Sequence, residues 1–173
     1  MMHKESERLY YRPLSFDILE NIYHQFSDEE MCKYYSEPAC TMDEAKEIIE
    51  HYSVSSGDSK PLSYFRAAMF DKVTEQFIGT VGYHFLDLSK KQVEIGYDVW
   101  KAFWGQGYGS EAVEMLINDC FNELAIDQIY ALVHPENLAS IGLLEKFEFV
   151  KCDPCRPFEE EPQICLKLVR QEK

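Results

Sequence analysis

Positive charge is scarce in this sequence. Its 173 residues include 17 Lys and Arg against 31 Asp and Glu, a formal net charge of −14 at pH 7. Non-specific binding to nucleic acids or to anionic membranes needs a basic face. We therefore expect no nucleic-acid partner and no membrane partner. An acidic surface favours a cationic partner such as an amine, although acidity also simply confers solubility.

Long apolar runs are absent as well. No hydrophobic run is long enough to span a bilayer, and the opening "MMHKESERLY" has no apolar signal-peptide core. We therefore expect a cytoplasmic protein whose six cysteines are reduced. No repeat, low-complexity tract or linker divides the chain, and 46% hydrophobic residues are enough for one core.

The cysteines lack the pattern of a complete metal site. "CDPC" (Cys152 and Cys155) has the CxxC spacing of zinc and redox sites, but a structural zinc site needs a second pair or histidines at helical spacing. A thioredoxin-like motif would stand at a helix N-terminus, whereas Pro154 and Pro157 indicate a loop. We predict no metal, and a metal or redox role for this motif is the weakest alternative.

The hydrophobic periodicity predicts an α+β fold rather than a strict βαβ repeat. Apolar stripes at helical spacing predict four helices, the first with Ser15 as its cap and the second with a capping box of Thr41 and Glu44. These helices are expected at residues 15–26, 41–52, 110–124 and 135–147. Strands are expected at residues 8–14, 62–70, 76–88, 92–100, 128–134, 148–152 and 162–169. The strand at 92–100 alternates, with an apolar face of Val93, Ile95, Tyr97 and Val99 and a second face of Glu94, Gly96, Asp98 and Trp100.

The segment "WGQGYGSEA", residues 104–112, has three glycines in five positions between a predicted strand and a predicted helix. The first turn of a helix has unpaired N–H groups and partial positive charge, and glycines let a phosphate approach them. A tight strand-to-helix connection is the alternative, but one glycine would suffice for it. The spacing differs from the G-x-G-x-x-G of dinucleotide folds, and no Gly-Lys-Ser/Thr follows as in a P-loop. The pattern favours anion binding.

Two stretches, "VEIGYDVWKAFWGQGYGSEAVEML" and "VHPENLASIGLLEKFEF", together resemble the GNAT superfamily of N-acetyltransferases. More narrowly, they resemble its RimJ/RimL-like branch, of the ribosomal-protein-alanine N-acetyltransferase type. The resemblance implies one GNAT-like domain over residues 1–173, with an acetyl-CoA-binding core at about 93–149. It also implies a mixed central sheet of about six or seven strands with helices on both faces. This sheet would be splayed between the fourth and fifth predicted strands.

The same resemblance implies where acetyl-CoA binds. The pantetheine arm would lie between the splayed strands and pair with backbone near Val99. Asn137 and Ser140 would approach the pantetheine and the thioester sulfur, although a helix cap and a first-turn residue explain them equally well. The family's loop pattern places the diphosphate on a run of backbone N–H groups, from Gly105, Gln106, Gly107, Tyr108, Gly109 and Ser110.

Catalysis of amine acetylation needs a neutral nitrogen, which a carboxylate can provide by accepting a proton. By analogy with RimL-like enzymes, Glu94 is the expected general base, and the alternative is a solvated carboxylate on a strand. Many family members carry a tyrosine acid where this chain has Leu144. Ser140 or a bound water would then be the proton donor to the thiolate leaving group. Because the pKa of a thiol is near 8.5, the thiolate leaves fairly well without such a donor.

The resulting hypothesis is an N-acetyltransferase in which a primary amine, on a protein N-terminus or a small molecule, attacks acetyl-CoA directly. The alternative is a catalytically silent acyl-CoA-binding sensor or partner module, which Leu144 favours and which Glu94 and Ser140 argue against. The chain would act as a monomer or homodimer. His84, His134 and four aromatic residues are further candidates for the acceptor side: Phe16, Tyr34, Tyr35 and Tyr83.

Overall fold

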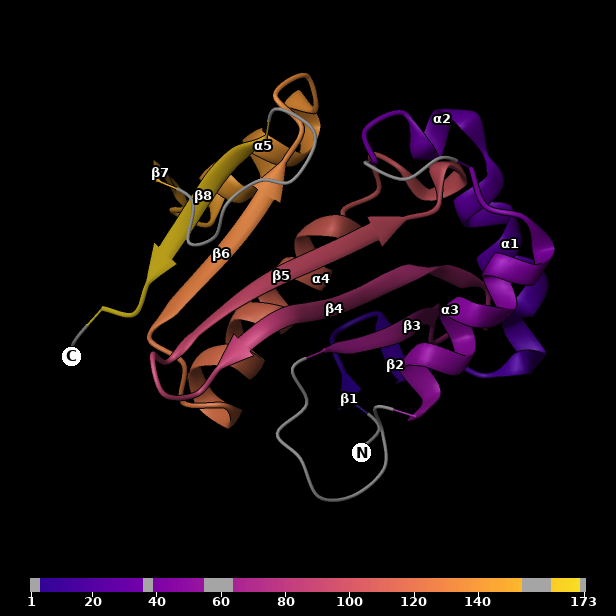
Figure 1. Cartoon of the computed structure of the whole chain (residues 1–173), viewed down its shortest axis with the longest axis horizontal. Coiled ribbons are helices and arrows are strands. Elements are labelled where there is room, and N and C mark those ends of the chain that lie inside the picture. Colours follow the sequence, from indigo (N-terminus) through magenta and orange to yellow (C-terminus); the bar gives the residue numbers. More distant parts are fainter. Residues whose placement is uncertain (1–3, 36–38, 55–63, 154–162, 172–173) are drawn as a thin grey trace.

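One mixed sheet of eight strands forms the centre of the molecule (Figure 1). The computed structural model describes residues 4–35, 39–54, 64–153 and 163–171. Within these residues the strand order is β1-β2-β3-β4-β5-β6-β8-β7, and only the β5–β6 pair is parallel. The strands are Lys4–Glu5 (β1), Leu9–Pro13 (β2), Phe65–Asp71 (β3), Phe77–Asp87 (β4), Gln92–Val99 (β5), Gln128–Val133 (β6), Val150–Cys152 (β7) and Ile164–Val169 (β8).

The predicted α+β class is confirmed, with one short strand more than expected. The additional strand, β1, has two residues and pairs with β2 through Lys4 and Glu5. Two residues are too few to show the alternation by which a strand is predicted from sequence. The seven predicted strands correspond in order to β2 through β8.

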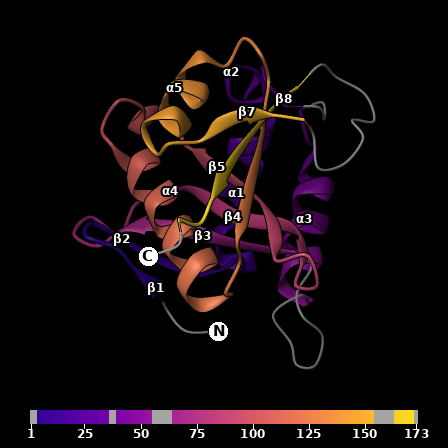
Figure 2. The same ribbon diagram turned by 90° about the vertical axis from the view of Figure 1, so that its left-hand side faces the viewer.

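Helices cover both faces of the sheet. The apolar side chains of β3 and β4 divide between two clusters, one on each face, whereas those of β5 all belong to the cluster on the α4 side. In Figure 2, α4 and α5 lie to the left of the strands and α3 lies to the right. Ala67 and Met69 of β3 belong to the α4 side, whereas Ala68 and Phe70 belong to the α1 and α3 side. The helices are Leu19–Ser27 (α1), Glu29–Cys32 (α2), Met42–Val54 (α3), Tyr108–Asn118 (α4) and Leu138–Lys146 (α5).

Local signals set most helix boundaries. The predicted capping box is confirmed, since the Thr41 amide donates to Glu44 Oε2 at 2.6 Å and the Glu44 amide donates to Thr41 Oγ at 3.3 Å. The prediction of Ser15 as a side-chain cap is wrong, because its hydroxyl accepts from Arg12 and contacts Asp17 instead. Within the described residues, no helix has the length and apolar character needed to cross a bilayer.

Strands β5 and β6 part soon after they pair. Their parallel bridges are Gln92–Gln128, Val93–Ile129 and Glu94–Tyr130. Beyond Glu94, β5 stays registered with β4, while β6 stays registered with β8 (Figure 1). This divergence is the splay that the family resemblance implied between the fourth and fifth predicted strands.

The backbone of β5 has an open edge beyond the splay point. The Trp100 amide donates to the Ile78 carbonyl at 2.7 Å, so even-numbered residues at this end of β5 bond to β4. Because donors and acceptors alternate along an antiparallel strand, Tyr97 and Val99 turn their N–H and C=O groups the other way, toward β6. The edge of β5 that faces the splay therefore offers main-chain partners for an extended ligand.

Candidate functional site

The glycine loop leads directly into α4. Gly105 and Gly107 have φ angles of +71° and +85°, in the left-handed region that glycine tolerates best. Gly107 is the N-cap, so α4 begins at Tyr108, two residues before the predicted start. The first helical hydrogen bond runs from the Glu111 N–H to the Gly107 carbonyl at 3.2 Å. The N–H groups of residues 108–110 precede that bond and are oriented for an anion at the helix end.

Two of the three glycines fit a phosphate cradle, and the third has a packing role. A Cβ on Gly105 would meet no atom within 4 Å, so the backbone there is open to a ligand. A Cβ on Gly109 would lie 3.1 Å from Leu143 Cδ2. Gly109 therefore allows α4 to approach α5 closely, a reason that the sequence reading did not include. The loop as a whole fits the diphosphate of a coenzyme.

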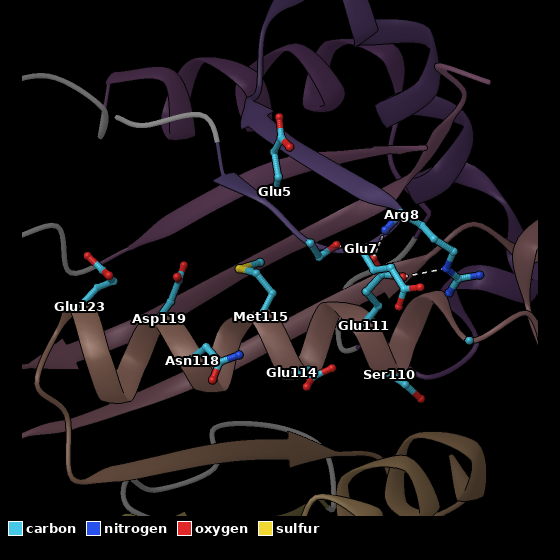
Figure 3. Close-up of a pocket in the computed structure, with 12 residues that line it drawn as sticks. Glu5, Glu7, Arg8, Ser110, Glu111, Glu114, Met115, Asn118, Asp119 and Glu123 are labelled. Carbon is cyan, nitrogen blue, oxygen red and sulfur yellow. Dashed lines mark hydrogen bonds and ion pairs between the residues drawn. The ribbon is translucent and has the colours of Figure 1, made fainter. Parts of the chain in front are cut away.

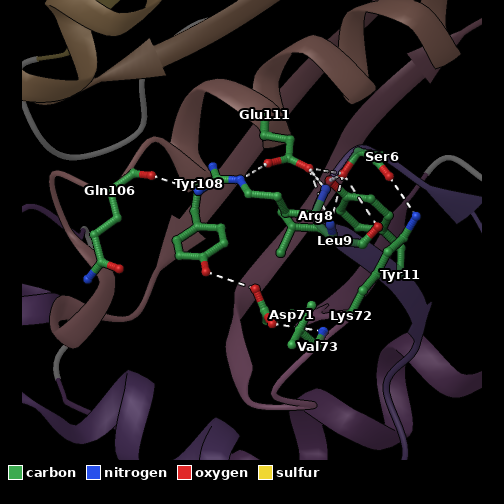
Figure 4. Close-up of polar contacts among 10 residues, drawn as sticks. All are labelled: Ser6, Arg8, Leu9, Tyr11, Asp71, Lys72, Val73, Gln106, Tyr108 and Glu111. Atoms are coloured by element: carbon green, nitrogen blue, oxygen red, sulfur yellow. Dashed lines mark hydrogen bonds and ion pairs between the residues drawn. The ribbon is translucent and has the colours of Figure 1, made fainter.

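Side chains from outside the loop hold it in place (Figure 4). Arg8 Nη1 donates to the Gln106 carbonyl at 2.9 Å, and Arg8 Nε forms an ion pair with Glu111 at 2.9 Å. The Tyr108 hydroxyl donates to Asp71 Oδ2 at 2.9 Å. Hydrogen bonds from the Thr74 amide and from Tyr108 lower the pKa of Asp71 to about 2. The loop conformation is thus fixed by β2 and β3 before any ligand arrives.

Trp104 links the loop to the edge of β5. Its indole N–H donates to the Val99 carbonyl at 2.7 Å. This bond gives a structural reason for tryptophan at the first position of the loop pattern. It also leaves the Val99 N–H, rather than its carbonyl, for a ligand along β5. The Gln106 side chain donates to the Ala102 carbonyl at 3.0 Å, so at Gln106 the main chain is the part available to an anion.

The N-terminus of α5 brings a serine beside β5. Asn137 Oδ1 accepts from the Ser140 amide at 3.2 Å, which confirms Asn137 as a helix cap. Ser140 Oγ lies 2.8 Å from Tyr97 Oη. Leu144, one turn further along α5, is fully buried in the core. The sequence reading counted Tyr97 only as part of the apolar face of its strand and missed this contact.

Glu94 and Asp98 lie on the other face of β5, as the alternation predicts, but in different surroundings. Asp98 accepts from the hydroxyls of Tyr35 at 2.6 Å and Thr80 at 3.2 Å, and it pairs with Arg66 at 3.4 Å. Asp98 therefore has a structural role, joining β5 to β3, to β4 and to the segment that follows α2. Glu94 instead stands at the splay point, opposite His84 of β4.

Aromatic rings surround His84 on this face. The ring of His84 has its centre 6.3 Å from that of Tyr52 and 6.1 Å from that of Tyr64. A Cβ on Gly96 would meet only the His84 ring, at 3.7 Å from Nε2, so the strand surface beside Glu94 is bare. Aromatic faces near a carboxylate are typical surroundings of an amine or ammonium group.

The remaining acceptor-side candidates divide into two groups. Tyr34 lies with its ring 5.3 Å from that of His134, which joins the end of α2 to the end of β6. Tyr83 points to the opposite face and packs against Phe65, with ring centres 5.1 Å apart. Phe16 is exposed beside α1. Tyr35, which donates to Asp98, is thus on the face of β5 that Glu94 occupies, whereas Tyr83 is on the opposite face.

An acidic groove lies between the N-terminal segment and α4 (Figure 3). Its volume is about 800 Å³, and its charged lining consists of Arg8 and six carboxylates, namely Glu5, Glu7, Glu111, Glu114, Asp119 and Glu123. Arg8 is already paired with Glu111. The negative electrostatic potential of these carboxylates repels a polyanion such as a diphosphate. The groove reaches the glycine loop at Gly107 and Ser110, so its carboxylates disfavour an anion on that side of the loop.

Among the described residues, no three His, Cys, Asp or Glu side chains are grouped so that they could hold a metal ion. Cys152 Sγ lies 3.2 Å from Cys165 Sγ across β7 and β8. Cys155, the second cysteine of the CxxC motif, lies outside the described residues, so the prediction about that motif stays untested.

Comparison with known proteins gives concordant results. The family described as "Acetyltransferase (GNAT) domain" matches residues 8–150. An N-acetyltransferase of Bacillus licheniformis, p20, itself uncharacterized, is 33% identical over 156 residues, which are 90% of this chain and 86% of p20. Spermidine N-acetyltransferase from Vibrio cholerae, solved with CoA and spermine, superposes with a TM-score of 0.78 at 18% identity, over 94% of this chain and 95% of that one. A Vibrio cholerae protein provisionally named a ribosomal-protein-serine acetyltransferase superposes with a TM-score of 0.81 at 20% identity, over 98% of both chains.

Proposed function

This chain belongs to the GNAT acetyltransferase family, and from that premise we propose that it transfers an acetyl group from acetyl-CoA to a primary amine by direct attack on the thioester. We propose further that residues 1–173 form one N-acetyltransferase domain of the RimJ/RimL-like branch, with its acetyl-CoA-binding core at about 93–149. It would act in the cytoplasm, without a metal, as a monomer or homodimer.

The observation that carries this proposal is the convergence of two features on one opening. The backbone edge of β5 faces the splay from Glu94 onward, and the first turn of α4 adjoins the end of that edge, since a Cβ on Gly109 would lie 3.9 Å from Val99 Cγ2. The Val99 amide would pair with the pantetheine arm. The amides of Gln106, Gly107, Tyr108, Gly109 and Ser110, following the open backbone at Gly105, would bind the diphosphate.

The chemistry follows from the groups around the opening. The thioester supplies an acetyl carbon that the amine attacks, so that a C–N bond forms and the electron pair of the broken C–S bond leaves on sulfur. Glu94, directly or through water, would accept the proton that the nitrogen loses. The amide near Val99 would stabilise the negative charge that develops on the carbonyl oxygen. Asn137 and Ser140 would approach the pantetheine and the sulfur from α5.

The surroundings of Glu94 support a cationic acceptor. His84 lies opposite this carboxylate in the register of β4 and β5, the rings of Tyr52 and Tyr64 lie beside His84, and the net charge of −14 attracts cations. Polyamines and peptide N-termini share this chemistry. Spermidine, a polyamine, and a ribosomal-protein serine occur in the names of proteins with the same fold.

A thiol-release assay tests the proposed function. Purified protein is mixed with acetyl-CoA and, in turn, with a polyamine, single amino acids and short peptides, and free CoA is measured. We expect release that depends on one class of amine. Saturable acetyl-CoA binding without release for any amine would favour the silent acyl-CoA-binding module instead.

Replacing Glu94 with glutamine is expected to lower kcat about 100-fold at neutral pH while leaving the affinity for acetyl-CoA unchanged. The loss should shrink as the pH rises toward the pKa of the acceptor amine, because less of the amine then has to be deprotonated before it attacks. A pH series of kcat measures this, with Glu145→Gln on the exposed side of α5 as the matched control. Equal turnover of Glu94→Gln and wild type would mean that another base or bulk solvent takes the proton.

A further inference from the structure

The contact between Tyr97 and Ser140 is placed at the opening of the sheet. Tyr97 is three residues beyond the last β5–β6 bridge, which involves Glu94. Ser140 is in the first turn of α5, where Asn137 holds its amide at 3.2 Å. Their hydroxyl oxygens are 2.8 Å apart. The contact therefore joins the two elements that border the expected thioester, β5 and α5.

Resting on the proposed function, we infer that Tyr97 is a positioning residue. It donates its hydroxyl hydrogen to Ser140, and this bond turns the hydrogen of Ser140 toward the sulfur that leaves from acetyl-CoA. A hydroxyl has one hydrogen to donate and two lone pairs to accept with. Once Ser140 accepts from Tyr97, its own hydrogen is available to a third group.

The donor direction follows from the chemistry of the two hydroxyls. A phenol is more acidic than an alkyl alcohol and is the better donor of the pair. Burial raises the pKa of Tyr97 to about 12, so the phenol keeps its hydrogen at neutral pH. Packing against the apolar core on the α4 side also restricts the ring.

The pair stabilises the leaving sulfur through a hydrogen bond, without transferring a proton to it. With a thiol pKa near 8.5, moving a proton from Tyr97 to a thiolate is unfavourable by roughly three powers of ten. The C–S bond therefore breaks with its electron pair on sulfur, Ser140 donates a charge-assisted hydrogen bond to that sulfur, and the thiolate takes its proton from solvent. This arrangement needs no tyrosine at position 144, where Leu144 is part of the core.

Two variants, Tyr97→Phe and Ser140→Ala, test the inference together with their double variant. We expect Tyr97→Phe to lower kcat about 10-fold, with an unchanged KM for acetyl-CoA, because a hydrogen bond to a charged group is weakened. The double variant should be no slower than Ser140→Ala, since both changes remove the same donor. Thermal unfolding is recorded for every variant.

Binding gives a readout that does not depend on turnover. In Tyr97→Phe the thiol pKa of bound CoA, read from its ultraviolet thiolate absorbance, should rise, while the affinity for desulfo-CoA stays that of wild type. A purely structural role would lower the affinity for both ligands and the unfolding temperature. If Tyr97→Phe does not fold, fluorotyrosine at position 97 keeps the ring size and strengthens the donor. The thiol pKa should then fall.

The outcomes separate the two proposals. If wild-type protein releases no thiol with any amine, the proposed function fails. If wild type is active and Tyr97→Phe, or the fluorotyrosine variant, has the same kcat and the same bound thiol pKa, the role of Tyr97 is overturned and the proposed function stands.

Discussion

Glutamate at position 110 is expected to weaken acetyl-CoA binding about 30-fold or more relative to glutamine at the same position. Ser110 is the third residue of α4, next to the amides proposed to bind the diphosphate. Two unit charges about 4 Å apart interact with roughly 4 kcal/mol at an effective dielectric constant of 20. Part of this repulsion is relieved because a surface side chain can turn away. The affinities of Ser110→Glu and Ser110→Gln are compared by calorimetric titration.

This substitution separates ligand binding from folding. A carboxylate in the first turn of a helix is favourable for the helix dipole, so Ser110→Glu should unfold at the temperature of Ser110→Gln or above it. Acetyl-pantetheine, which has the thioester arm without the diphosphate, serves as the control ligand, and both variants should bind it equally. Equal affinity of the two variants for acetyl-CoA would mean that the diphosphate does not bind at the N-terminus of α4.

Alanine at position 98 is expected to destabilise the fold by about 3–5 kcal/mol, the usual cost of removing one partner of a buried ion pair. The side chains of Asp98 and Arg66 are only 12% and 15% exposed. Without Asp98 the guanidinium of Arg66 stays buried without its counter-ion, and the Tyr35 hydroxyl loses its acceptor. Chemical denaturation measures the free energy of unfolding.

A double variant identifies the cause of that loss. In Asp98→Ala/Arg66→Met the buried cation is gone as well, so the protein should regain a large part of the stability that Asp98→Ala lost. Glu47→Ala, on the exposed side of α3, is the control and should change stability by less than about 0.5 kcal/mol. A double variant as unstable as Asp98→Ala would show that the charge of Arg66 is not the reason.

Local sequence patterns were sufficient to predict most strands and helices of this structure. Alternation along residues 92–100 predicted β5 and the two faces of its side chains, and the capping box predicted the start of α3. The glycine loop was predicted to precede a helix, and it does. The splay of the sheet came from the family resemblance, because pairing between distant strands leaves no local signal.

The contacts that shape the candidate site depend on distant segments and were not predicted. Arg8 reaches Gln106 across 98 positions of sequence, and nothing in either neighbourhood indicates it. Tyr97 was assigned to an apolar face, which is right for its ring and uninformative about its hydroxyl. Gly109 was counted with the phosphate loop, although a nearby Leu143 explains it by packing. In each case the role of the residue depends on which distant segment the fold places beside it, and local periodicity does not indicate that.

A crystal structure with acetyl-CoA bound tests the central claim most directly. We predict that the pantetheine arm lies along the open edge of β5, near the Val99 amide, with the diphosphate within hydrogen-bond distance of the amides of residues 106–110. A diphosphate bound out of reach of these amides, for example along the carboxylates of the acidic groove beyond Glu114, would contradict the account of the glycine loop and of the coenzyme site built on it.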